Sequence, residues 1–140
     1  MRTTEYDDAS ARPRLTLHRM RLEVITGPDA GTVLETEGHR ARIGADRRNE
    51  LALTDPKVSR AHAEVVRSER GVFLRDRGST NGTWMGSARV TEAQLAGIQT
   101  FRVGRSQIRF TPLDEEVDVR PSEATQFANS RRPLPWVIGG

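Results

Sequence analysis

Two clusters of polar residues stand out in the middle of the sequence, and their side chains suit the binding of an anion. The first is Lys57-Val58-Ser59-Arg60 and the second is Gly78-Ser79-Thr80-Asn81-Gly82. Together they offer hydroxyl and amide hydrogen-bond donors and the positive charges of a lysine and an arginine. Charge-assisted hydrogen bonds from such groups are typical of phosphate sites, so phosphate is the expected ligand.

The stretch between the clusters predicts a hairpin. The short apolar runs Ala61–Val66 and Val72–Leu74 are separated by the turn-forming residues Ser68-Glu69-Arg70-Gly71. If the two runs pair as antiparallel strands, both polar clusters lie at the same end of the hairpin. The geometry of a hairpin is therefore enough to bring the candidate residues together.

The rest of the chain predicts short strands as well. Leu22 and Val24 alternate with charged neighbours, which is the period-two pattern of a strand with one buried face. Turns rich in glycine separate the segments, and only Thr91–Leu95 is expected to form a helical turn. Such a pattern favours an all-β sandwich. The further predicted strands are Thr32–Thr36, Ala41–Gly44, Leu51–Leu53, Ala88–Val90, Phe101–Val103 and Ile108–Phe110.

The composition indicates one domain with flanking segments. The chain has 140 residues, of which 29% are charged and 5% aromatic, so the core must be mainly aliphatic. Residues 1–19 are polar and predict a flexible N-terminal tail, and residues 20–112 form the predicted domain. Residues 113–140 change from acidic to basic and proline-rich, which predicts a linker or C-terminal tail that leads to a further domain.

Several classes of function are excluded by what the sequence lacks. There is no cysteine, and the three histidines have no metal-ligand spacing, so no metal and no cofactor is expected. No apolar stretch is long enough to span a membrane and the N-terminus has no signal-peptide core, which predicts a cytoplasmic protein. The net charge is +3, and the arginines are spread along the chain without interleaved aromatics. Direct binding of nucleic acid by this segment is therefore not expected.

Three motifs together resemble the forkhead-associated (FHA) domain. They are Ile43-Gly44, Ser59-Arg60-Ala61-His62 and Ser79-Thr80-Asn81-Gly82-Thr83, in that order and at the family's separations. The resemblance covers roughly Arg21 to Thr111. It implies a β-sandwich of about eleven short strands with recognition loops at one end. It also implies binding to proteins or peptides phosphorylated on threonine by Ser/Thr protein kinases.

The resemblance assigns a role to each polar residue of the clusters. Ser59 matches the family serine whose hydroxyl contacts the phosphate, and Thr80 matches a loop threonine that also faces it. Arg60 offers its backbone N–H and its guanidinium. Asn81 matches the asparagine that holds the peptide backbone after the phosphothreonine. Lys57 lies where the family contacts either the phosphate or a residue further along the peptide.

Three other residues are expected to be structural. In the family, the histidine matched by His62 braces the loop through hydrogen bonds and takes no part in ligand binding. Gly44 and Gly82 are expected at turns, because glycine tolerates backbone conformations that other residues avoid.

The chain departs from the family pattern at Ala45. The family has an arginine directly after the glycine that Gly44 matches, and this arginine is its main phosphate ligand. Arg42, Arg47 and Arg48 are possible substitutes, although Arg42 precedes Gly44 and should point elsewhere. Two functions are therefore predicted: a phosphothreonine-peptide-binding signalling module, or a degenerate FHA domain that acts as a phosphate-independent protein-interaction or oligomerisation module.

Catalysis is not predicted. An enzyme would have to pair Ser59 with His62 and with Asp55 or Asp76, but a serine and a histidine three apart at the start of a strand rarely face each other. No nucleophile-elbow, P-loop or dinucleotide-binding motif is present. The layout of a domain followed by a linker instead resembles the N-terminal sensor region of bacterial σ54-dependent transcriptional activators, which implies a role in transcription regulation.

Overall fold

The computed structural model describes residues 14–118. This range contains thirteen strands and no helix. The outer parts of the expected tail and linker, residues 1–13 and 119–140, lie outside the described residues. Between residues 14 and 118 there is accordingly no helix long and apolar enough to cross a membrane.

The first sheet has six strands, and all of its pairings are antiparallel. In spatial order the strands are β10 (Ala88–Val90), β9 (Thr83–Met85), β12 (Gln99–Val103), β13 (Ser106–Pro112), β3 (Met20–Thr26) and β4 (Val33–Thr36).

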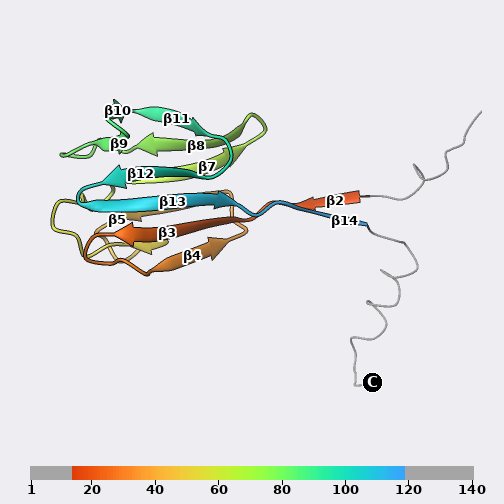
Figure 1. Ribbon diagram of the computed structural model, residues 1–140, viewed down its shortest axis with the longest axis horizontal. Helices are drawn as coiled ribbons and strands as arrows, with labels where there is room; N and C mark the ends of the chain where they lie inside the picture. Colours follow the sequence, from red (N-terminus) through yellow and green to blue (C-terminus); the bar gives the residue numbers. More distant parts are fainter. Residues whose placement is uncertain (1–13, 119–140) are drawn as a thin grey trace, which may run out of the picture. The chain divides into compact units, whose positions relative to one another are not determined.

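The second sheet has five strands, and only β5 and β6 pair in parallel. In spatial order they are β11 (Glu92–Leu95), β8 (Gly71–Asp76), β7 (Ala63–Ser68), β5 (Arg40–Gly44) and β6 (Leu51–Ala52). Figure 1 shows the two sheets as separate layers, with β3, β12 and β13 in one and β5, β7 and β8 in the other. The predicted all-β sandwich of about eleven strands is therefore confirmed.

Alternating side chains explain how the layers pack. In β3, Leu22 and Val24 are buried while Arg21 and Glu23 remain partly exposed, which is the predicted period-two pattern. The core is aliphatic apart from two phenylalanines, as the low aromatic content requires. The buried hydrophobic residues are Met20, Leu22, Val24, Ala41, Ile43, Leu51, Leu53, Val58, Ala63, Val65, Val72, Leu74, Leu95, Phe101, Val103, Ile108 and Phe110.

The predicted hairpin forms, and it positions the polar clusters as expected. Strands β7 and β8 pair antiparallel, with Val65 opposite Leu74 and a turn at Ser68–Gly71. One polar cluster leads into β7 and the other follows β8. Both clusters consequently lie at the same end of the sandwich.

Two strands of the second half differ from the sequence prediction. Thr91–Leu95 was expected to form a helical turn, and this was wrong: Glu92–Leu95 is strand β11. The side chain of Leu95 explains the difference, because Leu95 lies opposite Val72 of β8 and is buried there. Strand β9 was not predicted.

Strands β2 (Arg14–Leu17) and β14 (Glu115–Asp118) form an antiparallel ribbon, a unit separate from the sandwich of residues 18–114. These residues lie in segments that were expected to be irregular. Leu15 is opposite Val117 in the ribbon. The pairing was missed because the two segments lie about a hundred residues apart in the sequence, and no local pattern links them.

Candidate functional site

Two hydrogen bonds join the polar clusters. The backbone N–H of Thr80 donates to the hydroxyl oxygen of Ser59 over 3.1 Å, and the side-chain amide of Asn81 donates to the carbonyl oxygen of Lys57 over 2.8 Å. Ser59 is half-buried, whereas Lys57, Thr80 and Asn81 are exposed. The structure thus brings the predicted residues from both clusters together on an accessible surface.

These contacts leave hydrogen-bonding capacity for a ligand. A serine hydroxyl can accept two hydrogen bonds and donate one. The hydroxyl of Ser59 accepts from Thr80, so its O–H remains able to donate to an anion. Asn81 uses an amide N–H for the contact with Lys57, so its side-chain oxygen can still accept a hydrogen bond from a peptide N–H.

His62 is fully buried and holds the first cluster to the second. Its Nδ1 accepts a hydrogen bond from the backbone N–H of Ser59 at 3.0 Å, and its Nε2 lies 2.8 Å from the carbonyl oxygen of Gly82. Because Nδ1 accepts, the proton must be on Nε2, which donates to the carbonyl. The imidazole is therefore fully used inside the protein, and it points to neither a metal nor a substrate.

Asp76 organises the second cluster. Its carboxylate accepts hydrogen bonds from the backbone N–H groups of Gly78 and Ser79 and from the hydroxyls of Ser79 and Thr83, at 2.6–3.0 Å. Burial alone would raise the pKa of Asp76. The four hydrogen bonds outweigh it and lower the pKa below its usual range.

Asp55 performs the same task for the first cluster. Its carboxylate accepts from the backbone N–H of Lys57 on one oxygen, and from the backbone N–H of Arg105 and the hydroxyl of Ser106 on the other. Burial works to raise the pKa of Asp55, but these hydrogen bonds lower it overall. The cluster is thereby attached to the turn that precedes β13.

Gly44 is required by a close approach of two backbones. A Cβ atom at this position would lie 1.9 Å from the carbonyl oxygen of Arg60, much closer than any real contact. The neighbouring backbone hydrogen bonds explain the approach: the N–H of Ala45 donates to the carbonyl of Ser59 and the N–H of His62 donates to that of Ile43. The third loop, residues 45–50, is thus fixed beside the first cluster.

Gly82 has a positive φ of 88°, and a Cβ there would lie 2.6 Å from the Nε of Arg89. Any other residue would be strained in that backbone region. The same glycine gives its carbonyl to His62, so the turn places the acceptor that the histidine needs.

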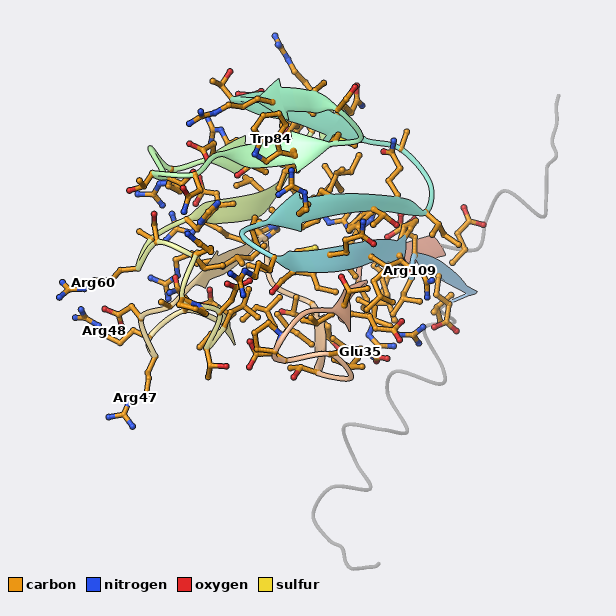
Figure 2. All side chains as sticks on the ribbon, turned by 60° about the vertical axis from the view of Figure 1, so that its left-hand side comes forward. Glu35, Arg47, Arg48, Arg60, Trp84 and Arg109 are labelled. Atoms are coloured by element: carbon orange, nitrogen blue, oxygen red, sulfur yellow. The ribbon has the colours of Figure 1, made fainter. Side chains whose placement is uncertain are left out.

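Positive charge gathers at this end of the molecule. Figure 2 shows Arg47, Arg48 and Arg60 projecting from the loops on the same side of the sandwich. Arg60, Arg47 and Lys57 are exposed and form no ion pair with any other residue between 14 and 118. Their charges are therefore available to an anionic ligand.

The other two candidate arginines are already paired. Arg42 binds Glu50, with 2.8 Å between its Nη2 and a carboxylate oxygen, and this hydrogen bond lowers the pKa of Glu50 to about 2. Arg48 binds Asp46 through two side-chain hydrogen bonds of 2.9 and 3.1 Å, which hold the pKa of Asp46 well below its usual range. Neither guanidinium is placed to replace the missing family arginine without first leaving its carboxylate.

Ala45 itself lies next to Ser59. Its N–H donates to the Ser59 carbonyl over 2.9 Å, and its side chain is exposed. The position that carries the arginine in the resembling family is thus at the edge of the candidate site, but in this chain it provides only a methyl group.

Sequence reasoning missed the residues that hold the loops. Asp55 and Asp76 were considered only as catalytic partners, and Ser79 and Asn49 were not assigned a role. Asn49 donates from its side-chain amide to the carbonyls of Asp46 and Arg60. An aspartate often forms a turn by accepting a hydrogen bond from the backbone N–H two residues later. Asp55 and Asp76 do so with the N–H groups of Lys57 and Gly78, and this tendency of aspartate could have identified both residues.

Comparison with known proteins finds one family model and several relatives that match this chain. Residues 23–114 match the family model described as the cytoplasmic domain of the inner membrane component of the type III secretion system. The protein FhaB of Mycolicibacterium smegmatis, described as FHA domain-containing, is 33% identical over 93 residues, which is 66% of this chain and 60% of FhaB. The FhaB of Mycobacterium tuberculosis is also 33% identical, over 97 residues, and the chain covers 63% of it. The chain therefore spans about 60% of the length of these curated relatives.

Solved structures extend the comparison. The FHA domain of FhaA, solved with the intracellular domain of Rv3910, is 31% identical with a TM-score of 0.58 over 65% of this chain and 98% of that domain. A domain from a study of phosphothreonine-dependent FHA interactions is 30% identical with a TM-score of 0.59, over 66% of this chain and 95% of that one. The chain belongs to the family of the type III secretion inner membrane component, cytoplasmic domain, whose model it matches. Like the two solved domains, it is also a member of the forkhead-associated (FHA) domain family.

Proposed function

We propose that this chain is a phosphothreonine-peptide-binding module that acts downstream of Ser/Thr protein kinases. The observation that carries the proposal is the hydrogen bond from the Thr80 N–H to the Ser59 hydroxyl. It joins two loops at an exposed end of the sandwich, and the Ser59 hydroxyl belongs to the same loop as Arg60 and Lys57, which form no ion pair within residues 14–118. A phosphothreonine presents nearly two negative charges and three strong acceptor oxygens, which match these donors.

The proposed roles follow from the geometry. Ser59 and Thr80 donate their hydroxyls to the phosphate, and Arg60 and Lys57 contribute positive charge. Asn81 accepts or donates a hydrogen bond with the peptide backbone. FHA relatives support this division, since one similar domain is described by its phosphothreonine-dependent interactions and the FhaA domain was solved with a protein partner.

Titration with matched peptides tests the proposal. A library of peptides with a central threonine and the same library with phosphothreonine are titrated into the protein. Phosphorylated peptides should bind at least about tenfold more tightly, because each charge-assisted hydrogen bond contributes about 1.5–3 kcal/mol and 1.4 kcal/mol is tenfold. Equal affinity for the two libraries would overturn the proposal.

A second function is favoured by one observation, the exposed methyl group of Ala45 at the edge of the site. Without an arginine there, the same loops could serve as a phosphate-independent protein-interaction or oligomerisation module. In that case peptides or partner domains would bind regardless of phosphorylation. The same titration separates the two functions.

We further propose that the module regulates a transcriptional activator of the σ54-dependent class. The support is the order of a sandwich domain followed by a proline-rich, charged segment in residues 113–140. The native reading frame tests this: an ATPase domain is expected downstream of Gly140, and a stop codon directly after Gly140 would overturn it.

A further inference from the structure

An arginine-rich groove lies beside the candidate site, where the loops of residues 45–50 and 57–62 meet β5 and the ends of β7 and β8. It has a volume of about 260 Å³ and opens next to the Ser59–Arg60 loop. Four of its lining residues are arginines, which come from β5, the loop of residues 45–50, the loop before β7 and the segment after β8. The lining residues are Arg42, Asp46, Arg48, Asn49, Arg60, Ala61, Ala63 and Arg77.

The groove has an excess of positive charge. Glu64 lies on the same sheet face, is 6% exposed, and is within 3.2–3.8 Å of the guanidinium groups of Arg40, Arg75 and Arg77. The carboxylates Asp46 and Glu50 pair with the arginines at the other end of the groove. Arg75 also pairs with Glu92 at 3.5 Å. With Arg60, six arginines thus lie around four carboxylates, so the groove attracts an anion even after these ion pairs are counted.

Arg60 connects the groove to the candidate site. Arg60 lines the groove and directly follows Ser59, and its side chain forms no ion pair within residues 14–118. The carbonyl of Arg60 is fixed by the side-chain amide of Asn49, another lining residue, at 2.8 Å. A peptide held at Ser59 and Thr80 is therefore within a few residues of the groove.

The size of the groove indicates what it holds. Small-molecule pockets usually measure about 300–1,000 Å³ and are mainly apolar. This groove is smaller, and four of its eight lining residues are arginines, whose guanidinium groups suit planar, bidentate contacts with carboxylate or phosphate oxygens. It therefore fits one anionic side chain better than a metabolite or a cofactor.

We propose that the groove is a second anion subsite, which binds an acidic or phosphorylated side chain flanking the phosphothreonine of the same peptide. The inference rests on the proposed phosphothreonine binding and goes beyond it, because it names the charge pattern of the ligand. The preferred ligand is thus a phosphothreonine peptide with a second negative charge nearby.

A scan of peptide charge tests the subsite. A phosphothreonine peptide with neutral flanks is compared with peptides that carry one aspartate or one further phosphothreonine at each flanking position. At the favoured position the added charge should tighten binding about three- to tenfold, as expected for an ion pair in a half-exposed groove. The phosphothreonine arm should exceed the aspartate arm if the groove prefers phosphate.

Variants place the effect in the groove. In the double variant Arg42→Gln/Arg77→Gln the gain from the added charge should fall to about twofold or less. Arg48→Gln should reduce the gain by a smaller factor; its side chain is 89% exposed and does not endanger the fold. The matched control is Arg109→Gln. Arg109 and its partner Glu23 both lie in the first sheet, and Figure 2 shows Arg109 far from the labelled arginines at the site. This control should keep the full gain.

The outcomes are distinguishable. If threonine and phosphothreonine peptides bind alike, the proposed function is wrong and the subsite falls with it. If binding depends on phosphate but no flanking charge tightens it, only the subsite is wrong. An equal loss of the gain in Arg48→Gln and Arg109→Gln would also contradict the subsite, because the effect would then come from net charge alone.

Discussion

At the scale of single residues, Ser59 links all three loops of the site. Its N–H donates to His62, its carbonyl accepts from Ala45 and its hydroxyl accepts from Thr80. His62 and Ala45 thus fix the backbone of Ser59, and the hydrogen bond from Thr80 orients its hydroxyl group. Because this donor is already held in position, little conformational entropy is lost when a ligand binds to it.

Replacing that hydroxyl should weaken phosphopeptide binding. Ser59→Ala removes the donor to the phosphate and the acceptor for the Thr80 N–H, so we expect a loss of about tenfold or more in affinity. Calorimetry measures it, and circular dichroism should show an unchanged fold. Ser87→Ala, an exposed serine on another loop, is the control and should bind normally. Equal binding by both variants would contradict the role of Ser59.

Restoring the missing arginine should strengthen binding. The exposed position of Ala45, hydrogen-bonded to the Ser59 carbonyl, has room for a longer side chain. Ala45→Arg should tighten phosphopeptide binding about tenfold, because a guanidinium adds one charge-assisted contact. The unphosphorylated peptide should bind as before. If both peptides gain equally, the new charge acts through general attraction and not through the phosphate site.

At the scale of the elements, two carboxylates, the buried one of Asp55 and the half-buried one of Asp76, hold the loops that connect the strands. Asp55 fixes the loop before β7, and Asp76 fixes the loop after β8. Both have lowered pKa values because hydrogen bonds to their charged forms outweigh burial. The loops therefore depend on ionised aspartates, which links their order to pH.

The free energy of unfolding should fall in acid. A carboxylate whose pKa is lower in the folded state stabilises the fold above its ordinary pKa of 3.8, and this stabilisation is lost as the pH falls through the lower value. Urea unfolding at about pH 7 and about pH 3 measures the difference. Asp76→Asn should be less stable at neutral pH and show a smaller loss in acid. Glu69→Gln, on the exposed turn between β7 and β8, should behave like the unmodified protein.

A methyl group at Gly44 should disturb the loop contact. The Cβ of Gly44→Ala would meet the Arg60 carbonyl oxygen, so the backbones must separate at a cost of about 1–3 kcal/mol or more. Denaturant unfolding measures the loss, and phosphopeptide affinity should fall with it. Gly38→Ala is the control, because its φ is not positive and its nearest neighbour would be 3.3 Å away. Equal stability of the two variants would contradict the close approach.

At the scale of the molecule, the strands with a clear alternation were predictable and the pairings of distant segments were not. Leu22 and Val24 identified β3, and the apolar runs around Ser68–Gly71 identified the hairpin of β7 and β8. The sequence of β11 predicted a helical turn, but Leu95 packs against β8 and the segment forms a strand. The local motifs located Ser59 and Thr80. The supporting role of Asp76 depends on four contacts that only the folded loop creates.

The charge distribution of the whole molecule predicts salt-dependent binding. Exposed arginines project from the end that carries the site (Figure 2), and ions screen exposed charges over about 10 Å at 0.1 M salt. Phosphopeptide affinity should therefore fall clearly when the salt concentration is raised from about 0.05 M to about 0.5 M. Fluorescence anisotropy measures the trend. An affinity that does not change with salt would indicate a mainly apolar interface.

The most direct test of the account is a nuclear magnetic resonance titration of the ¹⁵N-labelled protein with one peptide in threonine and phosphothreonine forms. The account predicts that only the phosphorylated form causes large shifts of the backbone amide signals of Ser59, Arg60, Thr80 and Asn81. The amides of the turn at Ser68–Gly71, at the opposite end of the hairpin, should stay in place. Equal shifts with both forms, or shifts confined to other surfaces, would contradict phosphothreonine recognition at these loops.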